Sequence, residues 1–237
     1  MTADLAVATD ESVHPLDDPI RGSLRGIHAP FARWSGRIAM YDPDVAPHVG
    51  HPETLLDEDW ADFATLVGPD TTVSLRGHGH TPPAGWEIID SFGLVQMDGS
   101  ALAVEHDPGL TVLGADDVPE ILDLIDRTRP GPYRVRTVEM GTYLGIRVDG
   151  RLVAMAGERL HPPGWTEISA VCTDDRFRGR GFGTRLVRAV GAGIRARGEV
   201  PFLHASQANT TAIRLYESLG FTLRTRSALT VVRTPPA

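Results

Sequence analysis

A glycine-rich stretch between a strand-like run and a helix-like run constrains this chain more than any other feature. The stretch runs from Arg178 to Thr184 and reads Arg-Gly-Arg-Gly-Phe-Gly-Thr. An apolar run rich in β-branched residues, 168–173, precedes it, and a segment with apolar residues at helical spacing, 185–190, follows it. Such a loop directs backbone N–H groups and the positive end of a helix dipole at one point. We therefore expect a phosphate or pyrophosphate group to bind there.

Two common phosphate-binding loops do not fit this stretch. The loop of P-loop NTPases needs a lysine after its second glycine, and the chain contains no lysine. A dinucleotide-binding loop belongs to the first strand–helix unit and needs an acidic residue at the end of the next strand. Here the loop comes late in the chain, and Glu199 follows a helix instead. A different phosphate ligand is therefore favoured.

The charges divide the chain into an acidic first part and a basic second part. All 23 basic residues are arginine. Residues 1–110 hold 5 arginines against 18 acidic residues, a net charge of −13, whereas residues 111–237 have a net charge of +5. The glycine-rich loop lies in the basic part, as an anionic ligand would favour. We do not expect a nucleic acid partner, because the pI is about 5.5 and the arginines are not interleaved with aromatic residues.

Other features of the sequence indicate a cytoplasmic protein without a membrane partner. No apolar run approaches the roughly 18 residues that a membrane span needs. Residues 1–12, which we expect to form a disordered tail, lack the basic and apolar regions of a signal peptide. Cys172 is the only cysteine, which excludes an intrachain disulfide and a zinc site built from cysteines.

Turn residues predict a domain boundary at Asp107-Pro108-Gly109. We expect an N-terminal α/β region over residues 13–106 and a second domain over residues 107–237. The elements expected in the first region are a helix over 55–67 and strands over 72–76, 86–89, 94–97 and 101–105. Those expected in the second are a helix beginning at Asp116 or Asp117, a hairpin at Asp149-Gly150, strands over 166–173 and 201–205, a helix on either side of the latter strand, and two C-terminal strands.

Two motifs together resemble one family. The loop matches the pattern Arg/Gln-x-x-Gly-x-Gly/Ala through Arg178, Gly181 and Gly183. The segment from Asn209 to Phe221 matches Asn-x-x-Ala-x-x-x-Tyr-x-x-x-Gly-Phe, with Tyr216 at the tyrosine. At this separation the motifs resemble the GCN5-related N-acetyltransferase (GNAT) superfamily, and the residues before the loop, 170–173, are similar to its FR47-like group. The resemblance covers about residues 108–235.

The resemblance implies a fold, a co-substrate and a partner. The fold is the α/β (α+β) GNAT fold, with a mixed, mostly antiparallel sheet flanked by helices. The first region is either a degenerate GNAT-like half, which we favour, or an unrelated cap. The co-substrate is acetyl-CoA or another acyl-CoA, the partner is an amine acceptor, and no metal is expected, since His78 and His80 lack a third ligand. The oligomeric state is open between monomer and homodimer.

The resemblance also assigns residues to the co-substrate. Backbone groups of Val171, Cys172 and Thr173 are expected along the pantetheine arm, and Asn209 opens the segment that packs near the thiol. Tyr216 matches the tyrosine that protonates the leaving thiolate, although a tyrosine at helical spacing can also serve core packing alone. The residues expected around the pyrophosphate are Arg178, Gly179, Arg180, Gly181, Phe182, Gly183 and Thr184.

The general base is less well defined by the sequence. An amine with a pKa near 10 is mostly protonated at neutral pH and must lose a proton before it attacks. Glu167 lies eleven residues before Arg178, an offset that matches the general-base glutamate of the histone acetyltransferase branch. Glu158, His204 and a chain of water molecules are the alternatives. Within its apolar run Cys172 is typical of a small buried hydrophobe rather than of a covalent nucleophile.

We therefore predict an acyl-CoA-dependent N-acyltransferase that moves an acetyl group directly to a primary amine in a ternary complex. The alternative is a non-catalytic acyl-CoA-binding or sensing protein, which would keep the loop without needing Tyr216 or a base.

Overall fold

The computed structural model describes residues 14–77 and 79–237, so the expected tail at 1–12 and His78 lie outside the described residues. No helix among these residues is long and apolar enough to cross a membrane. The α-helices are α1 (Pro19–Arg25), α2 (Asp57–Val67), α3 (Val118–Thr128), α4 (Phe182–Ala196) and α5 (Thr210–Ser218). Short 3₁₀ turns are η1 (Pro15–Asp17), η2 (Ala29–Phe31), η3 (Ala115–Asp117), η4 (Thr137–Met140) and η5 (Asp175–Phe177).

The strands form one large sheet and one small sheet. The large sheet has eight strands in the order β4-β11-β5-β10-β9-β8-β7-β6, and the small one is β1-β2-β3. In the large sheet only β9 and β10 pair in parallel among the described strands. The strands are β1 (Ala32–Ser35), β2 (Ile38–Tyr41), β3 (Val49–Gly50), β4 (Thr72–Arg76), β5 (Glu87–Asp98), β6 (Thr111–Leu113), β7 (Tyr143–Val148), β8 (Arg151–Glu158), β9 (Trp165–Thr173), β10 (Val200–Ser206) and β11 (Thr222–Arg233).

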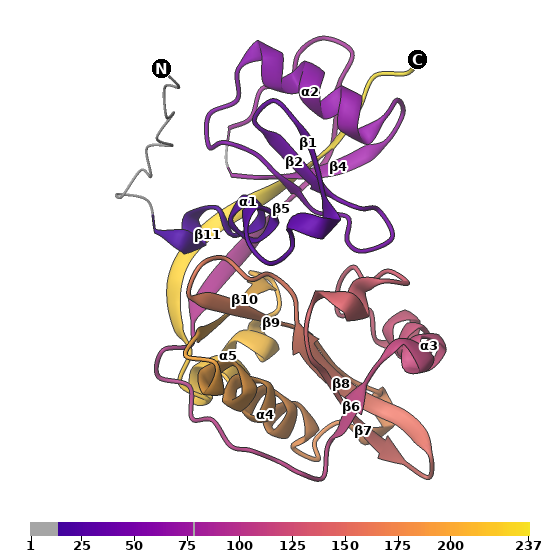
Figure 1. Ribbon diagram of the computed structural model, residues 1–237, viewed down its shortest axis with the longest axis vertical. Helices are drawn as coiled ribbons and strands as arrows, with labels where there is room; N and C mark the ends of the chain where they lie inside the picture. Colours follow the sequence, from indigo (N-terminus) through magenta and orange to yellow (C-terminus); the bar gives the residue numbers. More distant parts are fainter. Residues whose placement is uncertain (1–13, 78) are drawn as a thin grey trace, which may run out of the picture.

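Helices cover both faces of the large sheet, as the GNAT resemblance implies. The apolar side of α4, formed by residues at three- and four-residue steps, packs on β7 to β10. Helix α5 lies beside α4 (Figure 1), and Tyr216 and Leu219 join the same core. The two ends of β9 face different sides of the sheet: Ile168 joins this core, while Cys172 packs against α3 beyond an irregularity in the strand at Ala170. The prediction of a mixed, mostly antiparallel sheet flanked by helices is therefore confirmed.

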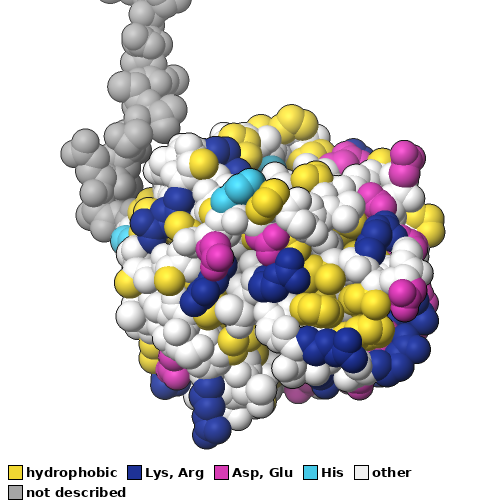
Figure 2. Space-filling view, turned by 90° about the horizontal axis from the view of Figure 1, so that it is seen from below, with side chains coloured by type: hydrophobic (Ala, Val, Ile, Leu, Met, Phe, Trp, Pro, Cys, Tyr) yellow, Lys and Arg dark blue, Asp and Glu magenta, His cyan; other side chains and the backbone are white. Residues whose placement is uncertain are grey.

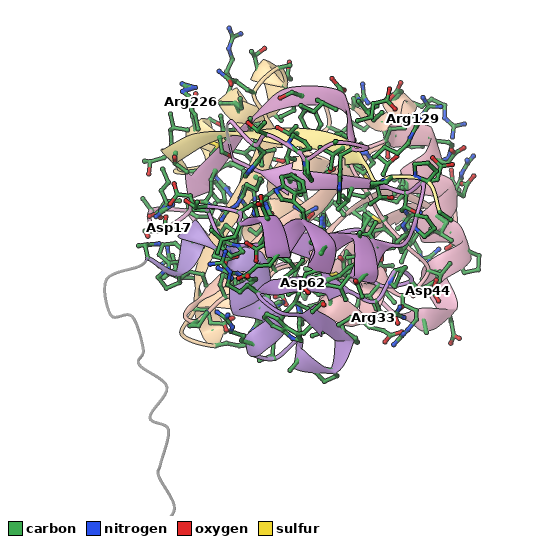
Figure 3. All side chains as sticks on the ribbon, turned by 90° about the horizontal axis from the view of Figure 1, so that it is seen from above. Asp17, Arg33, Asp44, Asp62, Arg129 and Arg226 are labelled. Carbon is green, nitrogen blue, oxygen red and sulfur yellow. The ribbon has the colours of Figure 1, made fainter. Side chains whose placement is uncertain are left out.

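The first region forms a cap over part of the sheet. The small sheet and α1 lie against the face that carries Phe202 and Leu160, where they build a second apolar core around Tyr41 and Leu24. Helix α2 crosses the upper side of the cap, with Asp62 on it (Figure 3), and Ser35 donates a hydrogen bond of 2.6 Å to the Asp62 carboxylate. The predicted helix over 55–67 thus corresponds to α2.

The first region also supplies two strands of the large sheet. Strand β5 lies between β10 and β11, and β4 lies on the other side of β11. In Figure 1 β5 and β11 run side by side from the cap into the lower part of the molecule. The large sheet therefore crosses the expected boundary at 106/107: the described residues of the first region form the cap, with its small sheet, and also contribute β4 and β5 to the large sheet.

Three details of the predicted strands need correction. The two expected C-terminal strands are one strand, β11. The expected strands over 86–89 and 94–97 are one strand, β5, because Ser91, Phe92 and Gly93 between them continue the pairing with β11. Residues 101–105 are not a strand. They cross the edge of α4 instead, where the N–H of Glu105 donates to the carbonyl of Arg188 at 3.3 Å.

We predict that residues 107–237 do not fold alone. Strand β11 pairs only with β4 and β5 in the described sheet, so their removal leaves β11 without a neighbour and exposes one edge of β10. Circular dichroism and thermal denaturation of a fragment 107–237 should show no cooperative transition. Co-expression with residues 1–106 should restore the transition of the full chain, and a cooperative transition of the fragment alone would contradict this interpretation.

Candidate active site

The glycine-rich stretch forms the predicted loop at the start of α4. Gly179 and Gly181 both have φ near +75°, a conformation that favours glycine, and Gly181 is the residue that caps α4. No side chain accepts a hydrogen bond from the first turn of α4 at this cap. A Cβ added at Gly179 or Gly181 would meet no atom within 4 Å, so the space in front of the loop is open. The structure thus presents free N–H groups at a helix N-terminus to a potential anion.

Arginine side chains surround the loop, and most of them bind a carboxylate. Arg178 lies 2.6 Å from Asp175, Arg185 lies 2.8 Å from Asp107, and Arg188 lies 3.4 Å from Glu105. Arg180 stacks over the ring of Phe177 at 5.0 Å. Arginine, acidic and apolar side chains share the face of the molecule seen from below (Figure 2). The positive charge near the loop is therefore partly balanced by carboxylates.

Strands β9 and β10 separate after three paired residues, which opens a wedge in the sheet. Val200, Pro201 and Phe202 pair with Trp165, Thr166 and Glu167, and no later residue of either strand pairs with the other. A bulge in β9 accompanies the separation: Ala170 has φ of +52°, and the pairing with β8 shifts there. The edges of the two strands that face each other beyond this point have no strand partner among the described residues. Their backbone groups are available to a ligand lying in the wedge.

Tyr216 packs in the same apolar core as Ile168 of β9 and Leu203 of β10, the residues that follow the last paired positions of these strands. Asn209 holds α5 in place, because its side-chain oxygen accepts a hydrogen bond of 3.1 Å from the N–H of Ala212. The ring of Tyr216 packs edge-on against Phe221 at 5.8 Å. Burial, with a smaller contribution from Cys172 of β9, raises the pKa of Tyr216 to about 12. The phenol therefore carries its proton at neutral pH.

Cys172 is buried, and its chemistry agrees with a packing role. The side chain is 7% exposed and packs with Met155 and Leu124 on the α3 side of the sheet. Burial raises the pKa of the Cys172 thiol to about 11. A neutral thiol is a weak nucleophile, which is the behaviour that the apolar run in the sequence predicted.

Glu167 lies on the face of the sheet that the cap covers and is fully buried. Arg159 donates two hydrogen bonds to its carboxylate, at 2.8 and 2.7 Å, and Nδ1 of His204 lies 2.7 Å from Oε1. Burial alone would raise the pKa of Glu167, but the charge and hydrogen bonds of Arg159, together with the hydrogen bond from His204, hold it well below its usual value. Glu167 is therefore ionised and fully bonded.

The two other candidates for the base lie in different surroundings. Glu158 accepts hydrogen bonds from the N–H of Thr142 at 3.1 Å and from Arg197 at 2.9 Å, at the far end of β8. His204 lies next to Glu167, and its Nε2 is 3.1 Å from the side-chain amide of Gln96. The structure thus bonds Glu167 to His204, whereas Glu158 is bonded to other partners, although it lies opposite Ile168 in the strand register.

Cap residues close the space above Glu167. Nε2 of His48 is buried without a hydrogen-bond partner in the described chain. Burial foremost, and then the charge of Arg159, lower the pKa of His48 to about 3, so its imidazole is neutral. Nε2 of His28 donates to the carbonyl of Met140 at 2.9 Å, and its Nδ1 accepts from the hydroxyl of Tyr41 at 2.7 Å.

Sequence reasoning did not find Arg159, Gln96 or the cap histidines. Arg159 lies near Glu167 because β8 and β9 are neighbours, and Gln96 comes near it because β5 pairs with β10. None of these residues belongs to a motif. The pattern of a charged residue, Arg159, between buried apolar stretches is the single signal that could have indicated a buried ion pair. Among residues 14–77 and 79–237 no group of three or more histidine, cysteine or acidic side chains could hold a metal ion.

Replacing Glu167 with glutamine should strongly destabilise the fold. The change leaves the guanidinium of Arg159 without its counter-charge in a buried site, which costs about 3–5 kcal/mol of unfolding free energy. Urea denaturation measures the loss, and Glu139→Gln is the control, because the Arg136–Glu139 pair is exposed and should matter little.

The effect should also depend on pH. The low pKa of folded Glu167 means that its stabilisation is complete above about pH 5 and declines as the pH falls below about 4, where the unfolded chain takes up the proton. Equal losses for the two variants, or a difference that grows on acidification, would contradict this assignment.

Comparison with known proteins identifies the family. The model of the family described as FR47-like protein matches residues 143–230. Over 82 residues the chain is 40% identical to the N-alpha-acetyltransferase RimI of Mycobacterium tuberculosis, a match that covers 33% of this chain and 51% of that protein. Over 84 residues it is 38% identical to a mycothiol acetyltransferase of Thermomonospora curvata, covering 35% of this chain and 28% of the other. These matches thus span about half or less of the curated relatives.

Solved structures extend the likeness to the whole chain. A protein of Novosphingobium aromaticivorans assigned to the GNAT family of acetyltransferases is 40% identical, has a TM-score of 0.85, and is matched over 95% of this chain and 100% of its own. A GCN5-related N-acetyltransferase from Kribbella flavida shares the fold with a TM-score of 0.56 at 18% identity, over 99% of this chain and 98% of its own. The chain therefore belongs to the GNAT family of N-acetyltransferases, as its loop and tyrosine motifs predicted.

Proposed function

We propose that the protein transfers an acyl group, in the first place acetyl, from acetyl-CoA directly to a primary amine. The observation that carries the proposal is the wedge between β9 and β10, with an open helix N-terminus at α4 and a protonated phenol, Tyr216, beside it. A thioester with a pyrophosphate at one end and a leaving sulfur at the other needs these features. The amine of a peptide N-terminus and that of a small molecule both remain possible acceptors in this proposal.

The co-substrate would be bound mainly by backbone groups. The N–H groups from Gly179 to Thr184, with the side chains of Arg178 and Arg180, would surround the pyrophosphate. The unpaired edge of β9 at Val171, Cys172 and Thr173 would hydrogen-bond the pantetheine arm. Asn209 would contribute by fixing α5, and thereby Tyr216, next to the sulfur.

The chemical step would be a direct transfer. The amine nitrogen attacks the thioester carbonyl carbon, the new C–N bond forms, and the C–S bond breaks. The sulfur leaves with the electron pair and takes a proton from the Tyr216 hydroxyl, which water then reprotonates. Because the pKa of Tyr216 is raised to about 12, the phenol stays in the donor form throughout the neutral range.

We propose that Glu167 contributes through the pair with His204 rather than as the proton acceptor. Its carboxylate is ionised, fully buried and bonded to three donor groups. Water would then take the proton of the amine, which is the last of the alternatives that the sequence left open. The cytoplasm is the proposed compartment, since the substrate is an acyl-CoA and the chain has one cysteine.

One observation favours the alternative of a non-catalytic acyl-CoA binder, namely that neither Glu167 nor Glu158 is free to act as a base. The two proposals differ in one measurement, the release of free thiol from acetyl-CoA with and without amines.

Tyr216→Phe should lower kcat for amine-dependent thiol release by about 10²- to 10³-fold, because the leaving thiolate loses its proton donor. The affinity for acetyl-CoA, measured by calorimetry, should change little, since the ring still packs against Phe221. In the wild type, the Tyr216 hydroxyl should keep its proton up to about pH 10, so deprotonation of this group should not lower the rate of thiol release below that pH. Release that no amine stimulates, or a Tyr216→Phe variant with full activity, would favour the binder.

Gly181→Ala should weaken acetyl-CoA binding by about tenfold or more, because a Cβ enters the open space in front of the loop. Gly198→Ala is the matched control: Gly198 has φ of +79°, an added Cβ there also meets nothing within 4 Å, and it lies at the opposite end of α4. Both variants carry the same backbone strain of about 1–2 kcal/mol, so equal Tm shifts are expected. Equal affinities in calorimetry would argue against the loop as the pyrophosphate site.

A further inference from the structure

A row of polar side chains crosses the sheet at the level where β9 and β10 separate. His204 of β10 lies directly opposite Gln96 of β5 in the strand register, and Gln96 is in turn opposite Thr225 of β11, next to Arg224. On the other side, the imidazole of His204 reaches Glu167, the last paired residue of β9. Through side chains the row therefore links four adjacent strands, β9, β10, β5 and β11, at the level where the backbone pairing of β9 and β10 ends.

The side-chain amide of Gln96 has only one possible orientation. Gln96 is 2% exposed, and its oxygen lies 2.8 Å from a guanidinium nitrogen of Arg224, which can only donate. Its nitrogen lies 2.9 Å from the backbone carbonyl of Leu16 in the cap, which can only accept. Exchange of the two amide atoms would place donor against donor and acceptor against acceptor. Asp17, at the margin of the molecule (Figure 3), pairs with Arg224 at 2.5 Å.

The orientation of Gln96 fixes the protonation of His204. The Gln96 nitrogen, a donor, lies 3.1 Å from Nε2 of His204, which must therefore accept and carry no proton. Nδ1 faces the ionised carboxylate of Glu167 at 2.7 Å and must donate. Both neighbours thus demand the neutral imidazole with its proton on Nδ1. The imidazole then has no free lone pair for the proton of an amine.

We propose that Gln96 is a positioning residue for acyl transfer, which holds His204 as the neutral Nδ1–H imidazole and thereby ties β9 to β10 at the apex of the wedge. The proposal rests on the proposed function. The Glu167–His204 hydrogen bond takes over where the backbone pairing stops, so it sets how far the two strands separate around the acyl group. Through Leu16 the cap is part of this arrangement.

The charged and titratable groups around His204 support a neutral imidazole. Glu167 faces it from β9, with Arg159 behind that carboxylate, and His48 faces it from the cap. Arg224 and Asp17 lie beyond Gln96. The two carboxylates are matched by the two guanidinium groups, so a second proton on His204 would add an uncompensated positive charge next to the wedge.

The test is the ¹⁵N NMR spectrum of the histidine side chains at neutral pH, with His204 assigned through His204→Gln. The wild type should show a protonated Nδ1 and an unprotonated Nε2. In Gln96→Glu the new carboxylate should accept from Nε2, so His204 should become doubly protonated, and kcat should fall by about tenfold or more with little change in KM for acetyl-CoA. Gln207→Glu, the same change on an exposed loop after β10, should alter neither spectrum nor kcat.

A second variant keeps the proposal testable should Gln96→Glu fail to fold. Gln96→Met has a similar shape without a donor, and it should retain the Nδ1 proton while losing part of kcat. A wild-type spectrum with a proton on Nε2 would overturn the proposal, as would Gln96→Glu or Gln96→Met with wild-type kcat. Absence of any amine-dependent activity in the wild type would instead refute the proposed function, while the spectrum would still decide the protonation of His204.

Discussion

The loss of pairing between β9 and β10 is the constraint on which the rest of the structure depends. A sheet that opens in its middle has backbone groups to satisfy and a gap to hold at a fixed width. The described residues meet the second need with a buried chain of bonds from Arg159 through Glu167 and His204 to Gln96. The unpaired backbone groups of β9 and β10 are left for a ligand in the wedge to hydrogen-bond. The backbone groups that the sheet leaves unpaired are therefore the same groups that a ligand in the wedge would bind.

The buried ion pair between Arg159 and Glu167 depends on the cap that covers it. Away from water, Arg159 and Glu167 can remain charged only because they are paired and hydrogen-bonded to each other. The cap excludes the water, and its Leu16 carbonyl fixes the amide that completes the row. A likeness to the Novosphingobium aromaticivorans protein over 95% of this chain includes the cap as well. The first region therefore belongs to the fold that the two proteins share.

Much of the family, fold and loop could be predicted because these are local features of the sequence. Gly181 before an amphipathic helix and Tyr216 within a complete motif are recognised from nearby residues alone. In the structure Gly181 caps α4, and Tyr216 packs in one core with residues of β9 and β10. The place of β5 could not be predicted, since strand order depends on partners about a hundred residues away. For the same reason Gln96 gave no signal. Glu167 was found by its offset, but its bonds to Arg159 depend on a neighbouring strand.

The central position of β5 has a consequence for how the chain is made. Ribosomal synthesis completes β5 at Asp98, yet its neighbours β10 and β11 begin only at Val200 and Thr222. During this interval both edges of β5 are unpaired, and its apolar side chains Ile88, Ile89 and Phe92 are exposed. The nascent chain therefore carries a segment that is prone to aggregation. Pairing at such sequence distance is slow, because loop closure precedes any gain from contacts. The sheet closes last at its centre, and the wedge can exist only in the finished chain.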